Sequence, residues 1–248
     1  MSAPTTFAWP HGAKAAVSLT FDDGRASQID VGLPILDAHG IQATFYVMPD
    51  AVEKKYAGWR KAVASGHEIG NHTLHHPCSA NFDWARNHAS EDYTLERMER
   101  EILDANLRIE QILGVVPRTF AYPCGLTFIG RGRTHASYVP LIAKHFLAGR
   151  GFLWETHAHP TGGDLGILPG FFSDDWTLDR YLARIETARA AGGWAIFCGH
   201  EVSPDSGYHN TRADALDALC AHLQRHRGEL WTAPVAEIAA YIRSRTQP

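Results

Sequence analysis

The sequence predicts an α/β fold in which parallel strands and helices alternate around a single barrel. Strand-like segments alternate with segments of helical periodicity along the chain, and the links between them are short, which is typical of βαβ units. No linker-like stretch divides the 248 residues, and 45% of them are hydrophobic, which is enough for one sizeable core. We therefore expect one domain spanning residues 1–248. In such barrels the catalytic groups lie at the carboxyl ends of the strands.

Six segments have the composition of buried strands. Residues 15–21 are small and apolar, residues 42–48 are rich in β-branched and aromatic side chains, and residues 194–198 are strongly apolar. The fourth strand is stopped by Pro123 and Gly125. In chain order the expected strands are 15–21, 42–48, 67–72, 118–122, 194–198 and 229–231.

Seven segments are expected to be helices because their apolar residues recur at helical intervals. Residues 27–38 show this spacing, although Pro34 interrupts the segment. Residues 91–113 form the longest segment and carry a continuous apolar stripe. In chain order the expected helices are 27–38, 56–65, 91–113, 137–147, 178–191, 213–225 and 234–243.

Charge and composition exclude several function classes. The net charge is −4 without a long run of either sign, so we expect neither a nucleic acid nor a membrane surface as partner. No secretory leader is visible at residues 1–11, and no apolar run approaches the roughly 20 residues of a membrane span. We therefore expect a cytoplasmic protein, or a secreted one if the chain has been trimmed.

Cysteine spacing argues against both a thiolate zinc site and a disulfide framework. No two of the four cysteines form a Cys-x-x-Cys pair, and their spacing is wide and uneven. We expect all four to be free thiols in a reducing compartment. They are Cys78, Cys124, Cys198 and Cys220.

The first expected strand ends on two adjacent carboxylates, Asp22 and Asp23, which are followed by Gly24. Two acids side by side at a strand end repel each other and lose hydration, so a cation is expected to hold them there. A metal ion would serve. The alternative is an ordinary strand followed by an Asp-Gly turn.

Two histidines at the end of the third expected strand are candidate metal ligands. His72 and His76 are four residues apart, a spacing that places two imidazoles on one side of a helical turn. His222 and His226 have the same spacing on a helix face that we expect to be solvated, and His75 competes as a ligand. The position of His72 and His76 at a strand end is therefore stronger evidence for metal binding than their spacing.

Four segments, in chain order, carry motifs that resemble one protein family. Residues 20–24 read Thr-Phe-Asp-Asp-Gly, and residues 72–76 read His-Thr-Leu-His-His. Residues 118–125 contain an arginine, an aromatic residue and then Pro-Cys-Gly, and residues 196–200 form an apolar segment that ends in histidine. This set resembles the polysaccharide deacetylase family, the NodB-homology domain of carbohydrate esterase family 4. The resemblance implies a distorted (β/α) barrel of the NodB-homology type.

The resemblance implies a divalent metal held by Asp23, His72 and His76. One carboxylate with two histidines suits zinc, and cobalt, nickel or iron are compatible with the same ligands. The resemblance also implies that Asp22 is the general base that activates water. Arg118 is implied to pair with Asp22 and to keep it ionised.

The later motifs imply the remaining catalytic groups. The backbone N–H of Cys124 and the metal are implied to stabilise an oxyanion, and His200 is implied to protonate the leaving amine. Cys124 stands where the family usually has tyrosine, and this change is tolerable because the implied group is a backbone N–H. A nucleophilic Cys124 is the alternative, although no basic partner is local. Cys198 stands where leucine is common.

The family's fourth motif, D-x-x-D-W, is incomplete in this sequence. Asp175 and Trp176 match its end, but Phe172 stands where its first aspartate belongs. We expect Asp175 to orient His200, with Asp174 as a competitor for this role. Trp176 is expected to line the sugar site.

Three segments are expected to be loops added to the framework, namely residues 77–90, 126–136 and 149–170. Because aromatic faces stack on sugar rings, these loops are candidates for a substrate groove, with ordinary loop packing as the alternative. The aromatic residues concerned are Phe82, Trp84 and Trp154, and we expect His157 and His159 to face solvent.

The residues and the resemblance together predict a metal-dependent hydrolase that removes acetyl groups from an N-acetylated amino sugar or oligo- or polysaccharide. An amide is a poor electrophile with a poor leaving group, so its hydrolysis needs activated water, a site for negative charge and a proton donor. The same site is compatible with an O-acetyl esterase of the acetylxylan type or a small-amide hydrolase. A non-haem iron oxygenase and a non-catalytic carbohydrate-binding relative are further alternatives.

Overall fold

The computed structural model describes residues 7–152 and 154–246. The strands are β1 (Ala15–Phe21), β2 (Thr44–Val47), β3 (Glu68–Asn71), β4 (Thr119–Ala121), β5 (Phe128–Ile129), β6 (Ala136–Ser137), β7 (Ala148–Arg150), β8 (Phe171–Phe172), β9 (Trp194–Gly199), β10 (Glu201–Ser203), β11 (Asn210–Arg212) and β12 (Leu230–Thr232). The α-helices are α1 (Leu33–His39), α2 (Pro49–Lys54), α3 (Tyr56–Ala64), α4 (Leu95–Leu113), α5 (Val139–His145), α6 (Leu178–Ala191), α7 (Ala213–Arg225) and α8 (Val235–Thr246).

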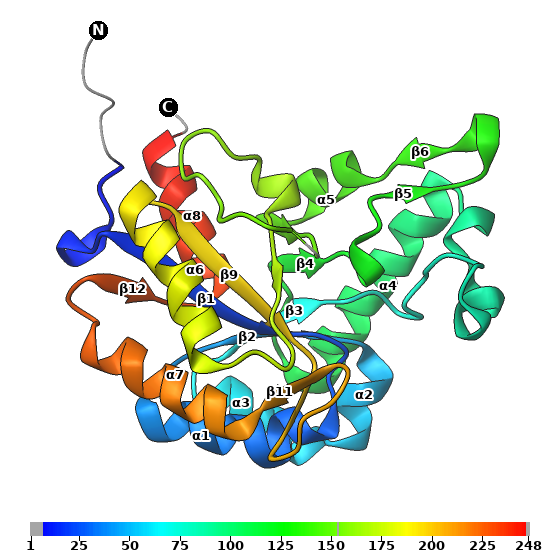
Figure 1. Cartoon of the computed structure of the whole chain (residues 1–248). Coiled ribbons are helices and arrows are strands. Elements are labelled where there is room, and N and C mark those ends of the chain that lie inside the picture. Colours follow the sequence, from blue (N-terminus) through cyan, green and yellow to red (C-terminus); the bar gives the residue numbers. More distant parts are fainter. Residues whose placement is uncertain (1–6, 153, 247–248) are drawn as a thin grey trace, which may run out of the picture.

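Eight of these strands form one sheet with helices packed around it, which confirms the predicted α/β class (Figure 1). The strand order is β7-β4-β3-β2-β1-β9-β8, β12 also pairs with β1, and the ladders of this sheet are parallel. Beyond β7, the N–H of Gly151 donates to Leu168 at 2.7 Å, and Leu168 lies just before β8. The sheet therefore curls into a distorted barrel.

The central strand β1 is buried along its whole length. It pairs with β9 over six residues and also with β2 and β12, so it has neighbours on both sides. Strands in this position read as continuous runs of small and apolar residues. The two polar residues of β1 are satisfied internally, because Ser18 Oγ donates to the Ala233 carbonyl and Thr20 Oγ1 donates to the Phe197 carbonyl, each at 2.7 Å.

Three apolar clusters hold the helices onto the sheet. The largest joins β1, β2 and β9 to α1, α3, α6 and α7, the second joins β1 and β9 to α8, and the third joins β4 to α4 and α5. Each large apolar side chain that is fully buried in these clusters, such as Trp59, contributes about 1.5–3 kcal/mol. The clusters fix the strand ends on which the candidate site is built.

The structure corrects several predicted element boundaries. The segment 27–38 is a π-helical turn, Gln28–Gly32, followed directly by α1, so Pro34 lies inside one continuous helical run, just after the π-helical turn. The helix predicted from residue 91 begins at Leu95, because Thr94 caps it by accepting the Arg97 N–H. One α-helix and six short strands were not predicted: α2, β5, β6, β7, β8, β10 and β11.

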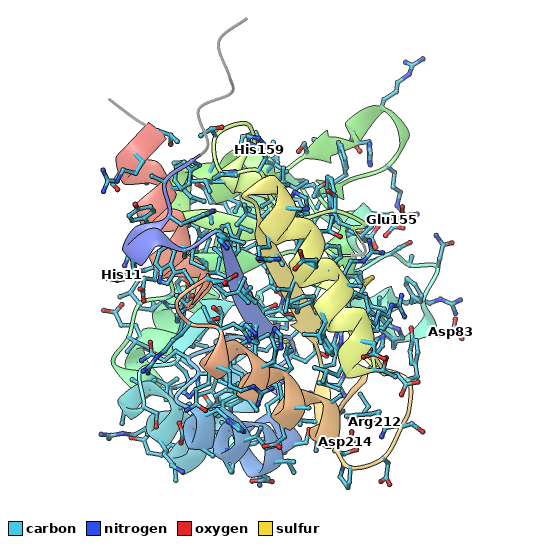
Figure 2. All side chains as sticks on the ribbon, turned by 60° about the vertical axis from the view of Figure 1, so that its left-hand side comes forward. His11, Asp83, Glu155, His159, Arg212 and Asp214 are labelled. Atoms are coloured by element: carbon cyan, nitrogen blue, oxygen red, sulfur yellow. A yellow bond between two sulfur atoms is a disulfide. The ribbon has the colours of Figure 1, made fainter. Side chains whose placement is uncertain are left out.

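The loop regions reach the periphery of the molecule. Figure 2 shows Asp83, in the loop after β3, and His159, in the segment between β7 and β8, at its outer surface. His159 is exposed as predicted, whereas His157 is half-buried. In the part of the chain that the structure describes, no helix has the length and apolar character needed to cross a membrane.

Candidate active site

The two adjacent aspartates at the end of β1 face different partners. The Asp22 N–H continues the sheet by donating to the Gly199 carbonyl, and Asp23 and Gly24 then turn the chain with left-handed φ values of 73° and 67°. Asp22 is buried beside Arg150, whereas Asp23 faces the two imidazoles of His72 and His76. Because the chain turns after Asp22, the two adjacent carboxylates lie in different environments.

His72 and His76 approach each other without the helical turn that their spacing predicted. Thr73 and His76 have left-handed φ values of 66° and 52°. The turn is held by hydrogen bonds in series, since the Thr73 N–H donates to Asn71 Oδ1 at 2.7 Å and the His76 N–H donates to Thr73 Oγ1 at 2.9 Å. The ring centroids of His72 and His76 are 4.8 Å apart.

Asp23, His72 and His76 fit a divalent metal. Asp23 Oδ1 lies 3.5 Å from His72 Nε2 and 3.6 Å from His76 Nε2, close to the separation of about 3.3–3.4 Å expected between tetrahedral ligands with bonds of about 2.0–2.1 Å. His72 Nδ1 donates a hydrogen bond to the Ala121 carbonyl, which is 3.0 Å away. This leaves Nε2 unprotonated and able to bind a metal. Burial and the neighbouring His72 lower the pKa of His76 to about 4, so His76 is in the neutral form that a metal requires.

The other candidate histidines lie elsewhere. His75 Nδ1 is 3.0 Å from Glu101, and its ring stacks on His88 at 4.5 Å. His222 and His226 stack on each other at 4.0 Å on α7. Neither set belongs to the two groups of three potential metal ligands found among the described residues.

The arginine that pairs with Asp22 is Arg150, so the prediction for Arg118 is wrong. Arg150 ends β7, is 0% exposed and forms an ion pair with Asp22 Oδ1. Arg118 precedes β4 and is exposed, at the opposite end of a strand that spans about 10 Å. In the β4–β7 ladder Arg150 is the partner of Ala121, which places the guanidinium at the carboxyl ends of the strands.

Asp22 is held ionised by its surroundings. Burial by itself raises the pKa of this carboxyl group, but the charge and hydrogen bond of Arg150, together with His72 and His200, outweigh burial and hold the pKa below its ordinary value. The Cys198 thiol lies 3.4 Å from Asp22 Oδ2 and donates to it. Asp22 Oδ2 also lies 4.0 Å from His72 Nε2, so this carboxylate borders the candidate metal site without belonging to it.

The carboxylate that orients His200 is Asp174, so the prediction for Asp175 is wrong. Asp174 Oδ2 lies 2.6 Å from His200 Nδ1, and its Oδ1 accepts the His200 backbone N–H and the Thr211 hydroxyl, both at 3.0 Å. Burial opposes the imidazolium, but the hydrogen bond and charge of Asp174, together with the charges of Asp22 and Asp23, outweigh burial and raise the pKa of His200. Asp175 has a left-handed φ of 55° and an exposed side chain, because its N–H turns to the Asn210 carbonyl.

Trp176 does not line a sugar site. It is buried and packs against Phe171, Tyr181 and Phe197 in the largest apolar cluster. The aromatic side chains around His200 are instead Phe152, Phe172 and His209.

Cys78 and Cys124 form a disulfide, so the prediction of four free thiols is wrong for this pair. Cys198 and Cys220 are free and buried. The disulfide removes the basis of the reducing-compartment prediction, because disulfides persist in oxidising environments. It also excludes Cys124 as a nucleophile while its sulfur is oxidised.

Sequence reasoning missed Arg150 and Arg25. The sequence does contain a signal for a strand at Arg150. A short apolar run before Arg150 follows a predicted helix and ends at Gly151. Arg25 Nη2 lies 2.8 Å from Asp23 Oδ2, and its Nη1 lies 3.2 Å from Glu201. Asp23 Oδ2 is therefore occupied by a guanidinium, while Oδ1 faces the imidazoles.

Aromatic side chains border the metal-ligand cluster on the loop after β3. Trp84 lies 5.6 Å from the ring of His76 and stacks on Phe82 at 5.7 Å. These two side chains are 60% and 50% exposed, which is unusual for residues of their size. They form an open apolar surface next to a candidate metal ligand.

Comparisons with known proteins find similar sequences over part of this chain and similar folds over most of it. Residues 10–129 match a family model described as polysaccharide deacetylase. A chitooligosaccharide deacetylase from Bradyrhizobium sp. strain ANU 289 is 44% identical over 64 residues, which cover 25% of this chain and 29% of that protein. The chain spans between 10% and 29% of the length of the curated relatives that it matches.

Two solved structures share the fold over most of their length. A proposed polysaccharide deacetylase from Mycobacterium smegmatis is 19% identical, with a TM-score of 0.70 over 99% of this chain and 96% of that chain. A family 4 acetyl xylan esterase from Clostridium thermocellum, in complex with a cobalt ion, is 25% identical, with a TM-score of 0.58 over 91% of each chain. The motifs at the strand ends and the match of residues 10–129 to the family model show that this chain resembles the polysaccharide deacetylase family, and the two solved structures show that it shares their fold.

Proposed function

We propose that this chain is a metal-dependent deacetylase that hydrolyses the N-acetyl group of an amino sugar within an oligo- or polysaccharide. The observation that carries the proposal is that a metal-ligand cluster and two acid–base pairs lie side by side at the strand ends. Asp23, His72 and His76 form a cluster that fits a metal, while the Asp22–Arg150 and Asp174–His200 pairs stand beside it as separate acid–base units. Amide hydrolysis needs each of these parts.

We propose zinc as the ion, with cobalt, nickel or iron as substitutes that the same ligands accept. When bound, such an ion lowers the pKa of water and polarises a carbonyl oxygen. The chain presents three protein ligands for such an ion, namely Asp23 Oδ1 and the two Nε2 atoms. A site with three protein ligands leaves coordination positions open, as a catalytic metal site requires.

Asp22 acts as the general base in this proposal. Arg150 keeps its carboxyl group ionised, and the Cys198 thiol and Arg150 hold its two oxygens in fixed orientations. A buried, ionised carboxylate next to the metal ligands takes the proton from the attacking water without first having to lose one itself.

His200 acts as the general acid. Because Asp174 binds Nδ1, the second ring nitrogen remains to donate a proton to the leaving amine. The raised pKa of His200 keeps a larger fraction of this imidazole protonated near neutral pH than an ordinary histidine would have. Asp174 thus serves as the group that orients the acid and maintains its charge.

The Cys124 N–H is proposed as a donor to the oxyanion. Cys124 has a left-handed φ of 53° within the turn Tyr122–Leu126, in which the N–H groups of Gly125 and Leu126 donate to Tyr122 and Pro123. Among the described residues the Cys124 N–H makes no such bond. The turn follows Ala121, whose carbonyl accepts from His72 Nδ1, and a free backbone N–H near a metal site is the kind of donor that stabilises a developing oxyanion.

The substrate is proposed to lie across the loop after β3. Phe82 and Trp84 present exposed rings beside His76, and sugar rings stack on such faces. The name of the Bradyrhizobium relative supports an N-acetylated amino sugar as the substrate class. Removal of an O-acetyl group, as the name of the Clostridium structure indicates for that protein, is the second candidate, because ester hydrolysis uses the same groups with less demand on His200.

The test is product analysis by mass spectrometry after incubation of the metal-stripped and metal-reloaded protein with chitooligosaccharides, acetylxylan and peptidoglycan fragments. Release of acetate from chitooligosaccharides that depends on the metal supports the proposal. Asp23→Ala is expected to lose the metal, whereas Asp22→Asn is expected to keep it and to lose turnover by about 10²-fold to 10⁴-fold. Asp175→Asn is the matched control and should behave like the parent.

Three outcomes would contradict the proposal. An Asp22→Asn variant that hydrolyses substrate as fast as the parent would refute the mechanism. Oxygen uptake that depends on ferrous iron would favour an oxygenase. Sugar binding that is unchanged by metal removal, without hydrolysis after reloading, would favour a non-catalytic binding protein.

A further inference from the structure

The Cys78–Cys124 disulfide joins two segments of the candidate site that are far apart in the sequence. Cys78 follows the metal-ligand candidate His76 by two residues, and Cys124 carries the proposed oxyanion donor. The sequence separation is 46 residues, and β3 and β4, which lead into these segments, are neighbours in the sheet. The bond therefore crosses from one strand end to the next on the catalytic side.

The two segments differ in how they are held without the disulfide. The turn that carries His76 has its own scaffold in the hydrogen bonds through Asn71 and Thr73. The segment of Cys78 is closed by the Ser90 N–H, which donates to the Cys78 carbonyl at 2.8 Å, and Cys78 is fully buried. This side of the disulfide is a fixed support.

Cys124 lies in a turn in which the N–H groups of Tyr122, Gly125 and Leu126 are hydrogen-bonded, whereas its own N–H is not, within the part of the chain that the structure describes. A left-handed conformation is unfavourable for an L-residue other than glycine, and Cys124 adopts it at the position whose N–H has no acceptor among the described residues. The neighbouring Ala121 carbonyl accepts from His72 Nδ1, so this turn adjoins the metal ligands. The disulfide therefore connects this turn, through the Cys124 side chain, to the buried residue Cys78.

We propose that the Cys78–Cys124 disulfide is a positioning clamp that holds the Cys124 N–H in register with the metal ligands, and that turnover depends on its oxidation state. The inference rests on the proposed function. Cys78 and Cys124 act through the backbone N–H and are positioning residues. A shift of the N–H by about 1 Å is enough to cost a reaction about 10²-fold, while the metal ligands keep their own hydrogen bonds.

The clamp opens by a two-electron reduction. A water-soluble phosphine attacks one sulfur, the S–S bond breaks, and a water molecule supplies the oxygen of the phosphine oxide and the two protons of the thiols. The phosphine is oxidised and the disulfide is reduced to two cysteines. Phosphine treatment therefore opens the clamp in the folded holoenzyme. After the phosphine is removed, thiol–disulfide exchange with a small soluble disulfide, which is reduced to two thiols, restores the bond.

The experiment compares the oxidised parent, the phosphine-reduced parent, Cys78→Ala and Cys124→Gly, which keeps a residue suited to the left-handed turn. Cys220→Ser is the matched control, because Cys220 is a buried free thiol on α7. Steady-state kinetics, zinc affinity by titration with a chelating indicator, and amide hydrogen exchange of residues 122–126 are measured for each form.

We expect reduction and Cys78→Ala to lower kcat by about 10-fold to 100-fold. KM and zinc affinity should change by less than about 3-fold, since substrate contacts and metal ligands are not displaced. Amide exchange of residues 122–126 should become faster. Reoxidation should restore the parent, and Cys78→Ala should not respond to the phosphine. Cys220→Ser should match the parent in both states.

Two results would overturn the clamp. Unchanged kcat in the reduced parent, with only a lower unfolding temperature, would make the disulfide a structural crosslink. If zinc affinity fell in proportion to kcat, the disulfide would act by positioning the metal ligand His76 and not by positioning the Cys124 turn. If the oxidised parent has no deacetylase activity, the proposed function fails, and amide exchange together with zinc affinity still decides whether the disulfide secures the turn. If Cys78→Ala does not fold, reduction of the folded parent provides the same comparison.

Discussion

Replacing Arg150 by glutamine tests the central electrostatic pair of the site. Arg150 and Asp22 are 0% and 3% exposed, so neither charge can turn to solvent when its partner is removed. Removing one partner of a buried ion pair typically costs about 3–5 kcal/mol, because the remaining charge is left unpaired. We expect Arg150→Gln to lower the free energy of unfolding by this amount at pH 7.

The pH dependence of this loss follows from the two states of Asp22. In the parent the pKa of Asp22 is below its ordinary value of 3.8, so its stabilising contribution is present above pH 3.8 and disappears as the pH falls through the native pKa. In Arg150→Gln burial dominates and raises the pKa of Asp22, so the variant loses stability as the pH rises above 3.8. The difference between the two proteins should therefore be largest at neutral pH and shrink below about pH 4.

The assay is urea unfolding between pH 3 and pH 8, roughly the range over which carboxyl groups and histidine titrate, together with kcat/KM at each pH. Turnover of Arg150→Gln should fall at neutral pH, because a neutral Asp22 cannot accept a proton. Arg118→Gln is the matched control, since Arg118 is exposed at the other end of β4, and it should retain both stability and turnover. If Arg150→Gln is as stable as the parent at pH 7, or if Arg118→Gln shows the loss instead, the assignment of the Asp22 partner is wrong.

Three further predictions concern the proton donor and the substrate surface. Asp174→Asn should lower the pKa of His200, shift the alkaline limb of the kcat/KM profile to lower pH and reduce turnover at neutral pH by about 10-fold to 100-fold, whereas Asp175→Asn should leave the profile in place. His200→Ala should reduce amide hydrolysis by about 10²-fold to 10⁴-fold and affect acetate esters much less, and equal losses on amide and ester would contradict its role as the acid. Trp84→Ala should raise KM for an oligosaccharide by about 2-fold to 10-fold and leave KM for a small acetate ester unchanged, which steady-state kinetics would measure.

The strand ends of the site could be predicted because their signals are local. An apolar run that stops on two acids marks β1 and Asp22–Asp23, and the motif around His72 and His76 follows a strand in the same way. Buried parallel strands leave this pattern in composition wherever they occur. The fold class could be predicted for the same reason, since strand and helix periodicities alternate along the chain.

Contacts between strand ends could not be predicted by these means. The incomplete fourth motif favoured Asp175 over Asp174, and only the left-handed turn at Asp175 shows that its side chain leaves the site. The third motif pointed to Arg118, yet the short β4 places that residue at the wrong end of the strand. The first error concerned which of two adjacent aspartates points into the site, which depends on the local backbone direction. The second concerned which of two neighbouring strands supplies the arginine, which depends on the pairing of β4 with β7.

The amino-acid sequence by itself determined the α/β class, and through the family resemblance of its motifs it indicated three candidate metal ligands, Asp23, His72 and His76, because strand composition and motifs are properties of neighbouring residues. Only the tertiary structure decided that Arg150 supplies the charge opposite Asp22 and that Cys78 is bonded to a cysteine 46 residues away. Pairings of this kind follow from the order of strands in the sheet. That order is set by packing of the whole core and cannot be deduced from any single segment of the sequence.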